Sequence, residues 1–486
     1  MATNRAHIIF LDTLVERCES FTTESSEVNS LHHPSDAPRI LTSCLCKAAN
    51  RVTERIKELR RSYPQASELL KNEIMAEASN ISNFIVFNSS LICPMLRNAS
   101  IENVPAEMVL PTERIARLVF PDCQVIIECV AEHNYYFREI GNRILDIFSS
   151  ADLEDILSQE EVFPSSLFRL QVCLNPPCGI LLHCLLGHEI GHAIYKARGV
   201  SSNLLPSINF NEQAIIDLIN TRFQQLQEDF ATRARRAPTQ ILLDQTRGFM
   251  EYITKMEILR VSSKWIEELF CDFIGTGLFG PAFICASSMF LLPFTQIDDS
   301  SDSHPSNRLR VQLSINALER SDPGFCYRLL YKPNLKNDVE PLIKPWKQLI
   351  GVRYIPPQDP VHKIAFEAVV NIKDKIIKEA KSALGDKYFH PSSYSKEVPQ
   401  LRKRLGGWLP PNEYQIKAGD KFSIASLQGI FNSGWLSYLE DMPNFISLLQ
   451  RLSESEVKSR FYGLVSKGIE SSEIQLRWGR AKSELR

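Results

Sequence analysis

The chain has 486 residues, of which 44% are hydrophobic, a share sufficient for the cores of roughly two to four domains. Its 55 basic and 57 acidic residues leave a formal net charge of −2. Because this balance provides no overall electrostatic attraction to a polyanion, we expect no nucleic-acid partner.

Helical patterns dominate the sequence, and the expected fold class is mainly α. Residues 43–61 and 66–84 predict two helices that Pro64 separates, and residues 125–130 form an apolar stretch that suits either a helix or a strand. Apolar and polar residues alternate over 167–174, which predicts a strand. By analogy with peptidases that bind an extended substrate, we expect this short sheet at the edge of a substrate cleft.

The next predicted helix contains the motif His188-Glu189-Ile190-Gly191-His192. Residues four apart share one face of a helix, so His188 and His192 can bind the same metal ion. Glu189 projects about 100° away and can hold a water molecule beside that ion. Gly191 is unfavourable inside a helix by roughly 1 kcal/mol, so we expect another element to pack closely against it. The motif predicts a zinc site with its own general base.

A helical hairpin is predicted between this motif and the next acidic segment. Residues 211–237 place apolar side chains at spacings of three and four, which indicates an amphipathic helix that ends at Pro238. A second helical pattern runs from residue 239 toward residue 268, so residues 205–260 are expected to form an inserted hairpin. The hairpin either packs against the body of the chain or acts as a lid or partner-binding element.

A catalytic zinc ion needs three protein ligands and an open position for water, so one more ligand must come from elsewhere in the chain. Residues 265–272 have a helical pattern in which Glu268 and Asp272 lie one turn apart on the same face, among large apolar residues. We predict Glu268 as the third ligand and Asp272 as the hydrogen-bond acceptor for the distal nitrogen of a ligating histidine. Glu267 is less favoured because the residue one turn beyond it is Cys271, but the sequence does not separate the adjacent glutamates.

The rest of the chain continues the helical pattern. Residues 361–384 and 424–449 predict helices, the second with a break at Pro443. The longest apolar run, residues 278–294, contains glycine, proline and serine and is shorter than the roughly 20 apolar residues of a membrane span. We expect no membrane span. The 12 cysteines lack the spacing of a disulfide framework and the amino-terminal segment lacks the apolar core of a signal peptide, so we expect a cytoplasmic location.

The motifs resemble those of the gluzincin metallopeptidases, in which a two-histidine helix is followed by a helix carrying Glu-x-x-x-Asp. Arg310 follows His304-Pro305 at 310 − 304 = 6 residues after the histidine, a pattern similar to the branch that includes CAAX prenyl endopeptidases and bacterial stress-response membrane proteases. The resemblance implies that His304 steadies the oxyanion and that Arg310 supports the site. The interval from His192 to Glu268, 268 − 192 = 76 residues, is longer than in the simplest gluzincins.

The expected activity is zinc-dependent hydrolysis of peptide bonds in a protein or peptide substrate. His188, His192 and Glu268 would hold Zn²⁺, and Glu189 would act as the general base. Hydrolysis of a non-peptide amide would use the same residues.

The expected organisation is a zincin-like metallopeptidase core over residues 151–310 between helical regions at 1–150 and 311–486. A different class of protein suits the same sequence: a zinc-binding interaction or sensor protein with a structural or gated metal site. In that alternative, the helical flanks would bind a regulatory protein partner. A fourth protein ligand on the metal would favour the alternative, and an open position beside Glu189 would favour hydrolysis.

Overall fold

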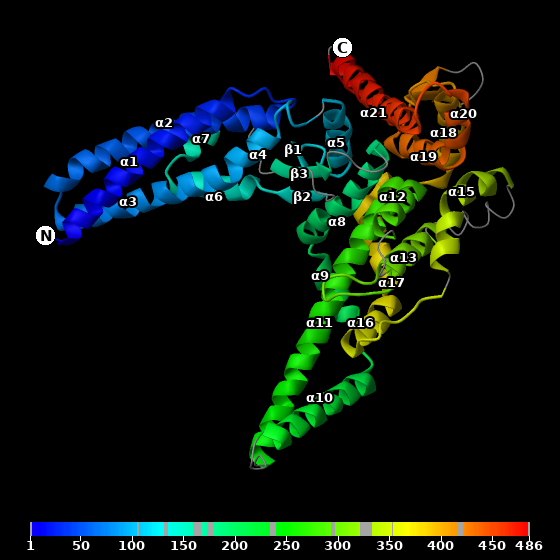
Figure 1. Cartoon of the computed structure of the whole chain (residues 1–486), viewed down its shortest axis with the longest axis horizontal. Coiled ribbons are helices and arrows are strands. Elements are labelled where there is room, and N and C mark those ends of the chain that lie inside the picture. Colours follow the sequence, from blue (N-terminus) through cyan, green and yellow to red (C-terminus); the bar gives the residue numbers. More distant parts are fainter. Residues whose placement is uncertain are drawn as a thin grey trace. The chain divides into compact units, whose positions relative to one another are not determined.

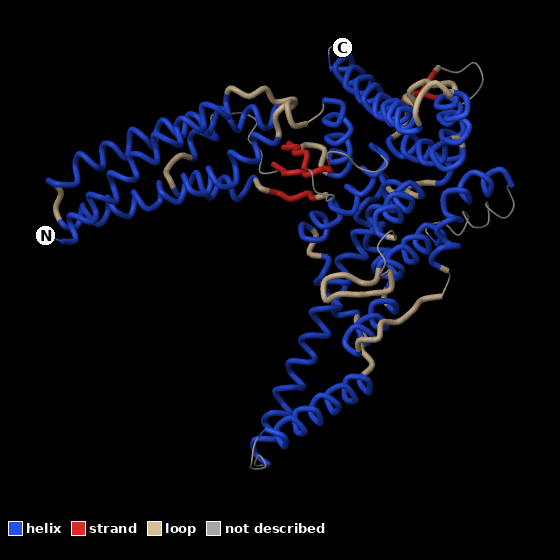
Figure 2. Tube along the Cα trace, viewed as in Figure 1, coloured by secondary structure: helices blue, strands red, loops and turns tan. Residues whose placement is uncertain are grey.

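The structure, a computed structural model, describes residues 2–104, 106–130, 135–158, 167–173, 179–233, 240–292, 297–320, 333–351, 353–415 and 421–484. Helices make up most of these residues (Figure 2), which confirms the expected mainly α fold class. The chain divides into two compact units, Met1–Pro177 and Cys178–Arg486, and Figure 1 labels most of their helices and strands. The division by motif into regions 1–150, 151–310 and 311–486 stays a prediction.

The first unit is a set of packed helices with one small sheet. The predicted helices at 43–61 and 66–84 are confirmed as α2 and α3, and Pro64 lies in the 3-10 turn between them. Helix α1 was not predicted, although buried residues from Leu11 to Val28 recur along it at helical spacing. The helical elements are α1 (Ala2–Asn29), α2 (Asp36–Ser62), η1 (Tyr63–Gln65), α3 (Glu68–Phe87), η2 (Asn88–Ile92), α4 (Cys93–Asn98), α5 (Ala106–Val119), α6 (Gly141–Ser150) and α7 (Glu154–Ser158).

The sheet of the first unit has the strand order β1-β3-β2. Strand β1 (Gln124–Val130) runs parallel to β3 (Leu167–Cys173), and β2 (Tyr136–Glu139) runs antiparallel to β3. The apolar stretch at 125–130 is therefore a strand, and the strand predicted at 167–174 is confirmed as β3. Its expected position at the edge of a substrate cleft stays a prediction.

The second unit is built around the long helix α11, which packs against α8, α13, α16 and α17. Its elements are η3 (Gly179–Leu185), α8 (Leu186–Ala197), α9 (Val200–Leu204), η4 (Leu205–Ser207), α10 (Glu212–Arg233), α11 (Gln240–Phe279), α12 (Pro281–Leu291), α13 (Asn307–Arg320), α15 (Pro333–Ile350), α16 (Pro360–Asn371), α17 (Lys373–Leu384), η5 (Gly385–Lys387), α18 (Pro391–Gly406), β4 (Glu413–Gln415), β5 (Phe422–Ile424), α19 (Leu427–Glu440), α20 (Met442–Leu448) and α21 (Glu454–Glu484).

The two-histidine motif lies on helix α8, as predicted, and begins in its first turn. The apolar residues before it form the 3-10 helix η3, in which the side chains of residues 180–185 are all buried. Trp435 on α19 donates a hydrogen bond from Nε1 to the Leu181 carbonyl at 3.2 Å, which gives this backbone oxygen a partner. Gly199 adopts the left-handed conformation just after α8, the geometry of a helix C-cap.

Helices α8 and α11 approach each other closely because glycines lie where they cross. A Cβ atom at Gly187 would lie 2.9 Å from the Cα atom of Gly275, and one at Gly191 would lie 2.6 Å from the Cα atom of Cys271. Both separations are too short for a side chain, so the close neighbour expected for Gly191 is the backbone of α11.

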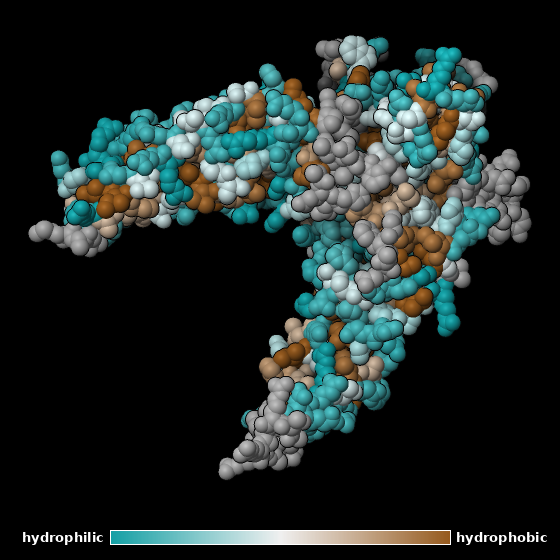
Figure 3. Space-filling view, viewed as in Figure 1, coloured by the Kyte–Doolittle hydropathy of each residue, from teal (hydrophilic) through white to brown (hydrophobic). Residues whose placement is uncertain are grey.

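The inserted hairpin is formed by α10 and the amino-terminal part of α11, which is one continuous helix of 40 residues. Arg222 joins the two helices through its Nη1 atom, 2.7 Å from Glu257 Oε2 and 3.2 Å from Thr254 Oγ1. Apolar side chains reach the surface along this pair (Figure 3), among them Ile216, Phe249, Tyr252, Ile253 and Met256. Pro238, which was predicted to end the first helix, lies outside the described residues.

Two of the helices predicted downstream are divided. The helix expected over 361–384 is interrupted at Ile372, whose ψ of 5° separates α16 from α17, and Gly385 ends the second helix at a φ of 55°. The break expected at Pro443 is confirmed between α19 and α20, while Ile424, expected to begin the helix, is the last residue of strand β5 and α19 begins at Leu427.

Among the described residues, no helix combines the length and the apolar content that crossing a membrane requires. Most of the apolar run at 278–294 forms α12, most of whose side chains are buried within the second unit. The residues 293–296 at the end of this run lie outside the described part of the chain.

The close approach at Gly191 generates a prediction for stability. We expect Gly191→Ala to lower the free energy of unfolding by about 1–3 kcal/mol, because the added methyl group must push α8 away from α11. Gly248→Ala is the matched control, since it lies on α11 with open space around it and should stabilise the helix by about 0.4–1 kcal/mol. Urea unfolding of the full chain measures both, and equal stability of the two variants would contradict the prediction.

Candidate metal centre

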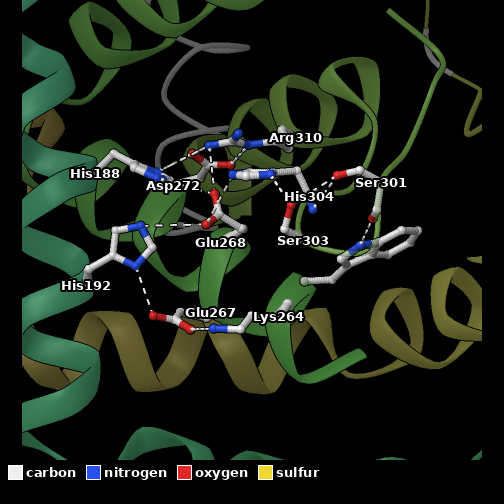
Figure 4. Close-up of polar contacts among 11 residues, drawn as sticks. His188, His192, Lys264, Glu267, Glu268, Asp272, Ser301, Ser303, His304 and Arg310 are labelled. Carbon is white, nitrogen blue, oxygen red and sulfur yellow. Dashed lines mark hydrogen bonds and ion pairs between the residues drawn. The ribbon is translucent and has the colours of Figure 1, made fainter. Parts of the chain in front are cut away.

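Helices α8 and α11 bring three predicted metal ligands together (Figure 4). His188 and His192 lie one turn apart on α8, with their ring centroids separated by 5.0 Å. Glu268 on α11 faces both rings: its Oε2 atom lies 3.4 Å from His188 Nε2, and its Oε1 atom lies 3.6 Å from His192 Nε2. Residues far apart in the sequence therefore face one another where the two helices meet.

The separations between these atoms suit zinc. Zn–N bonds of about 2.0–2.1 Å and Zn–O bonds of about 2.0–2.2 Å place tetrahedral ligand atoms roughly 3.3–3.5 Å from one another. The two nitrogen-to-oxygen separations, 3.4 Å to Oε2 and 3.6 Å to Oε1, are each close to that spacing, with a different oxygen of Glu268 facing each histidine. Two imidazoles and one carboxylate are also a donor set of catalytic zinc sites, so the residues present fit the metal predicted from the sequence.

Asp272 holds the opposite nitrogen of His188. Its Oδ1 atom lies 2.8 Å from His188 Nδ1, which is the contact predicted from the sequence. Arg310 on α13 donates to both carboxylate oxygens of Asp272, from Nε at 2.8 Å and from Nη2 at 2.9 Å. Burial alone would raise the pKa of Asp272, but Arg310 and His188 hold it well below its usual range. The ionised carboxylate orients the ring, so that His188 Nε2 points toward Glu268.

Glu267 holds the second histidine, a contact that the sequence analysis missed. Its Oε1 atom lies 3.0 Å from His192 Nδ1, and its Oε2 atom lies 3.3 Å from Lys264 Nζ. The hydrogen bond with His192 lowers the pKa of Glu267, and Lys264 adds to this effect. Glu267 and Glu268 therefore lie near different ring nitrogens of His192, Glu267 near Nδ1 and Glu268 near Nε2. The sequence could have indicated this contact. Each ligating histidine needs a hydrogen-bond partner for its second nitrogen, and Asp272 serves only one of the two histidines.

The metal-free site favours an ionised Glu268 and a protonated His188. Burial disfavours the charged form of Glu268, but the hydrogen bond with His188 and the charges of His188 and Arg310 outweigh it and lower the pKa to about 2. Burial likewise disfavours a charged His188, yet Asp272 and Glu268 outweigh it and raise the pKa to about 10. A zinc ion binds the neutral imidazole, so its binding must displace the proton on His188.

Glu189 follows His188 on α8 and is half-buried. Within the described part of the chain, no group forms a hydrogen bond or an ion pair with its carboxylate. Burial raises the pKa of Glu189, and the charges of His188 and His192 offset part of this rise. A carboxylate with a raised pKa and no competing partner is suited to proton transfer near neutral pH.

His304 approaches the Glu268 carboxylate from the loop before α13. Its Nε2 atom lies 3.6 Å from Glu268 Oε1, and its Nδ1 atom lies 2.8 Å from Ser303 Oγ. Burial lowers the pKa of His304, and the positive charge of Arg310 lowers it further. The structure therefore brings all the predicted site residues into one cluster: His188, Glu189, His192, Glu268, Asp272, His304 and Arg310.

A different group of three could also hold a metal ion. The ligand atoms of His188, His192 and Cys271 all lie within 4.8 Å of one another. Cys271 is fully buried beside Gly191, and burial raises the pKa of its thiol well above the usual value. Zinc binds the thiolate form of cysteine, so this environment opposes binding through sulfur. Glu268, whose pKa is lowered, stays the predicted third ligand.

No protein-family model, no curated protein and no solved structure matches this chain. The resemblance to gluzincins therefore stays a prediction. It depends on the motif residues and on their arrangement around Glu268.

The two possible third ligands can be separated by substitution. We expect Glu268→Gln to lower zinc affinity at least tenfold, because a neutral amide is a weaker zinc ligand than a carboxylate. We expect Cys271→Ala, which keeps the contact with Gly191 free of strain, to change zinc affinity by less than about threefold. Competition with a chromogenic chelator measures both constants. Loss of zinc in Cys271→Ala with retention in Glu268→Gln would reverse the assignment.

The raised pKa of His188 predicts that zinc affinity depends on pH. Because the metal-free His188 carries a proton below a pKa of about 10, affinity should rise between pH 7 and pH 9, by up to roughly tenfold per pH unit for one displaced proton. Glu268 is already ionised in this range and adds no dependence. Calorimetry in two buffers of different ionisation enthalpy counts the released protons. We expect fewer released protons in Asp272→Asn, because Asp272 helps to raise the pKa of His188. A native chain that releases no proton when it binds zinc would contradict the assignment of His188 as a ligand.

Proposed function

We propose that the chain is a zinc-dependent metallopeptidase that cleaves peptide bonds in a protein or peptide substrate. One observation carries the proposal: the Nε2 atoms of His188 and His192 face the two carboxylate oxygens of Glu268, at 3.4 and 3.6 Å. Asp272 and Glu267 hold the opposite nitrogens of the two rings, which fixes both imidazoles in the orientation that metal binding needs.

Zinc bound by these three residues would lower the pKa of a coordinated water toward about 7 and polarise the scissile carbonyl. The residues of the chain supply the proton transfers. Glu189 accepts the proton of the attacking water and then returns it to the amine that leaves, which means that one carboxylate serves as base and as acid. Its raised pKa and its lack of a hydrogen-bond partner among the described residues support this role.

His304 supplies a hydrogen-bond donor for the oxyanion that forms on the scissile carbonyl. When the Ser303 hydroxyl donates to Nδ1, at 2.8 Å, the neutral ring carries its proton on Nε2, the atom that faces Glu268. Arg310 supports the site through two carboxylates. It donates two hydrogen bonds to Asp272, and its Nη2 atom lies 3.4 Å from Glu268 Oε2. We assign it the role of holding both carboxylates in place.

A cytoplasmic location belongs to the same proposal. No disulfide joins the cysteines that the structure describes, which is the state expected in a reducing compartment. Peptide substrates and regulatory protein partners are the binding partners we propose, and nucleic acid is not among them.

The second candidate is a zinc-binding interaction or sensor protein. The group of His188, His192 and Cys271 favours it, because sulfur as a further ligand would close the position that water needs. We rank it second because Cys271 is buried and its thiol is held in the neutral form.

The decisive variant is Glu189→Gln. We expect it to bind zinc with unchanged stoichiometry and to lose about 10²–10⁴-fold in kcat, because the amide cannot accept the proton of the attacking water. Glu16→Gln is the matched control, since Glu16 is exposed on α1. The measurements are metal content and proteome-wide cleavage profiling against the native chain. Equal cleavage by Glu189→Gln and the native chain would rule out this general base.

A further inference from the structure

The loop over residues 297–306 presents His304 to the candidate metal centre. Within the loop, Ser301 N donates to the His304 carbonyl at 2.9 Å, and His304 N donates to Ser301 Oγ at 3.1 Å. These contacts set the shape of the loop. They do not fix its position relative to Glu268, and the His304 side chain is itself 53% exposed. The position of His304 must therefore come from contacts between the loop and other elements.

Asp302 is one point at which the loop is held. Arg260 on α11 donates from Nη2 to Asp302 Oδ2 at 2.5 Å, and His362 on α16 lies with Nε2 3.1 Å from Asp302 Oδ1. The hydrogen bonds with Arg260 and His362 lower the pKa of Asp302, which keeps its carboxylate ionised. Two helices of the second unit thus bind the same loop carboxylate.

His362 also binds the loop through its other nitrogen. Its Nδ1 atom lies 3.0 Å from Ser300 Oγ, and its side chain is only 13% exposed. The ring lies 5.5 Å from the ring of Trp265, whose Nε1 donates to the Ser301 carbonyl at 2.9 Å. Three consecutive loop residues are therefore held: Ser300 and Asp302 by His362, and Ser301 by Trp265.

The residues that hold the loop belong to a rigid frame around the site. Trp265 is fully buried on α11, three residues before Glu268. Helix α16 packs against α11, and the backbone N–H of His362 is fixed at its start by Asp359 Oδ1 at 2.9 Å. Because α11 also carries Glu268, a loop bound to this frame keeps His304 at a constant distance from that carboxylate.

We propose that His362 is a positioning residue, which holds Ser300 and Asp302 so that the His304 imidazole stays directed at the reacting carbonyl. The inference rests on the proposed peptidase function, and it assigns His362 no contact with the substrate. It explains why both nitrogens of a nearly buried histidine bind one polar loop.

The test is the His362→Ala variant of the full chain, alone and combined with His304→Ala. We expect His304→Ala to lower kcat about 10²–10³-fold and His362→Ala to lower it about 10–10²-fold, with KM and zinc content nearly unchanged. In the double variant, His362→Ala should add less than about threefold, because a positioning residue has no effect once the residue it positions is gone. If the losses of the two single variants multiply in the double variant, His362 acts independently of His304, and the inference is overturned.

Two further variants and a second readout complete the design. His362→Gln retains a donor that can reach Asp302 and should recover part of the activity, whereas His32→Ala, an exposed histidine of the first unit, should leave it unchanged. Hydrogen exchange over residues 297–306 does not depend on catalysis. It should accelerate at least tenfold in His362→Ala, because the amides of Ser301 and His304 lose the fixed loop geometry that protects them.

The two readouts separate the inference from the function on which it rests. Unchanged exchange in His362→Ala would overturn the positioning role, even in an active peptidase. Accelerated exchange in His362→Ala, together with no Glu189-dependent cleavage by the native chain, would support the anchoring of the loop and overturn the proposed function.

Discussion

The crossing of α8 and α11 is the constraint on which the candidate site depends. Two glycines on α8, Gly187 and Gly191, lie against the backbone of α11 at Gly275 and Cys271, at separations that exclude a Cβ atom. Histidine and glutamate side chains extend only a few ångströms from the backbone, so their atoms can share one ion only if the helices nearly touch. The glycines therefore determine the geometry of the site, although none of them carries a functional group.

The same contact between α8 and α11 brings several acidic side chains together, and their negative charges must be compensated. Four carboxylates gather near the crossing, and in the described part of the chain one arginine and one lysine bind them directly, Arg310 and Lys264. Burying acids without compensation costs several kcal/mol for each charge. Arg310 compensates Asp272, and the two histidines take up part of the remaining charge. A divalent cation between Glu268 and the imidazoles would complete the balance, which is a physical reason for the excess of acids. The carboxylates concerned are Glu189, Glu267, Glu268 and Asp272.

The sequence predicts the parts of the site that follow from local geometry. The spacing of four places His188 and His192 on one face of α8, and the same spacing places Glu268 and Asp272 on one face of α11. The position of Glu267 against His192 depends on how the two helices cross, which helical periodicity does not encode. The contacts of His362 with the loop join segments separated by about 60 residues, so no local pattern could reveal them. The fold follows the same rule: the long amphipathic helices α2, α3 and α10 are predictable, whereas the interruption at Ile372 is not.

The continuity of α11 also bears on the inserted hairpin. The helix runs unbroken from the hairpin through Glu267, Glu268 and Asp272, and it contains no proline. A lid that opened about a hinge would need α11 to bend between the hairpin and the site, where kinks usually require a proline, a glycine–serine pair or a π-bulge. Gly248 is the one glycine of α11 on the hairpin side of the ligand, and it is far from the site along the helix. A movement of the hairpin as a whole would carry Glu268 with it. Such a displacement would separate the Glu268 carboxylate from both histidines, so α11 couples the position of the hairpin to the geometry of the site.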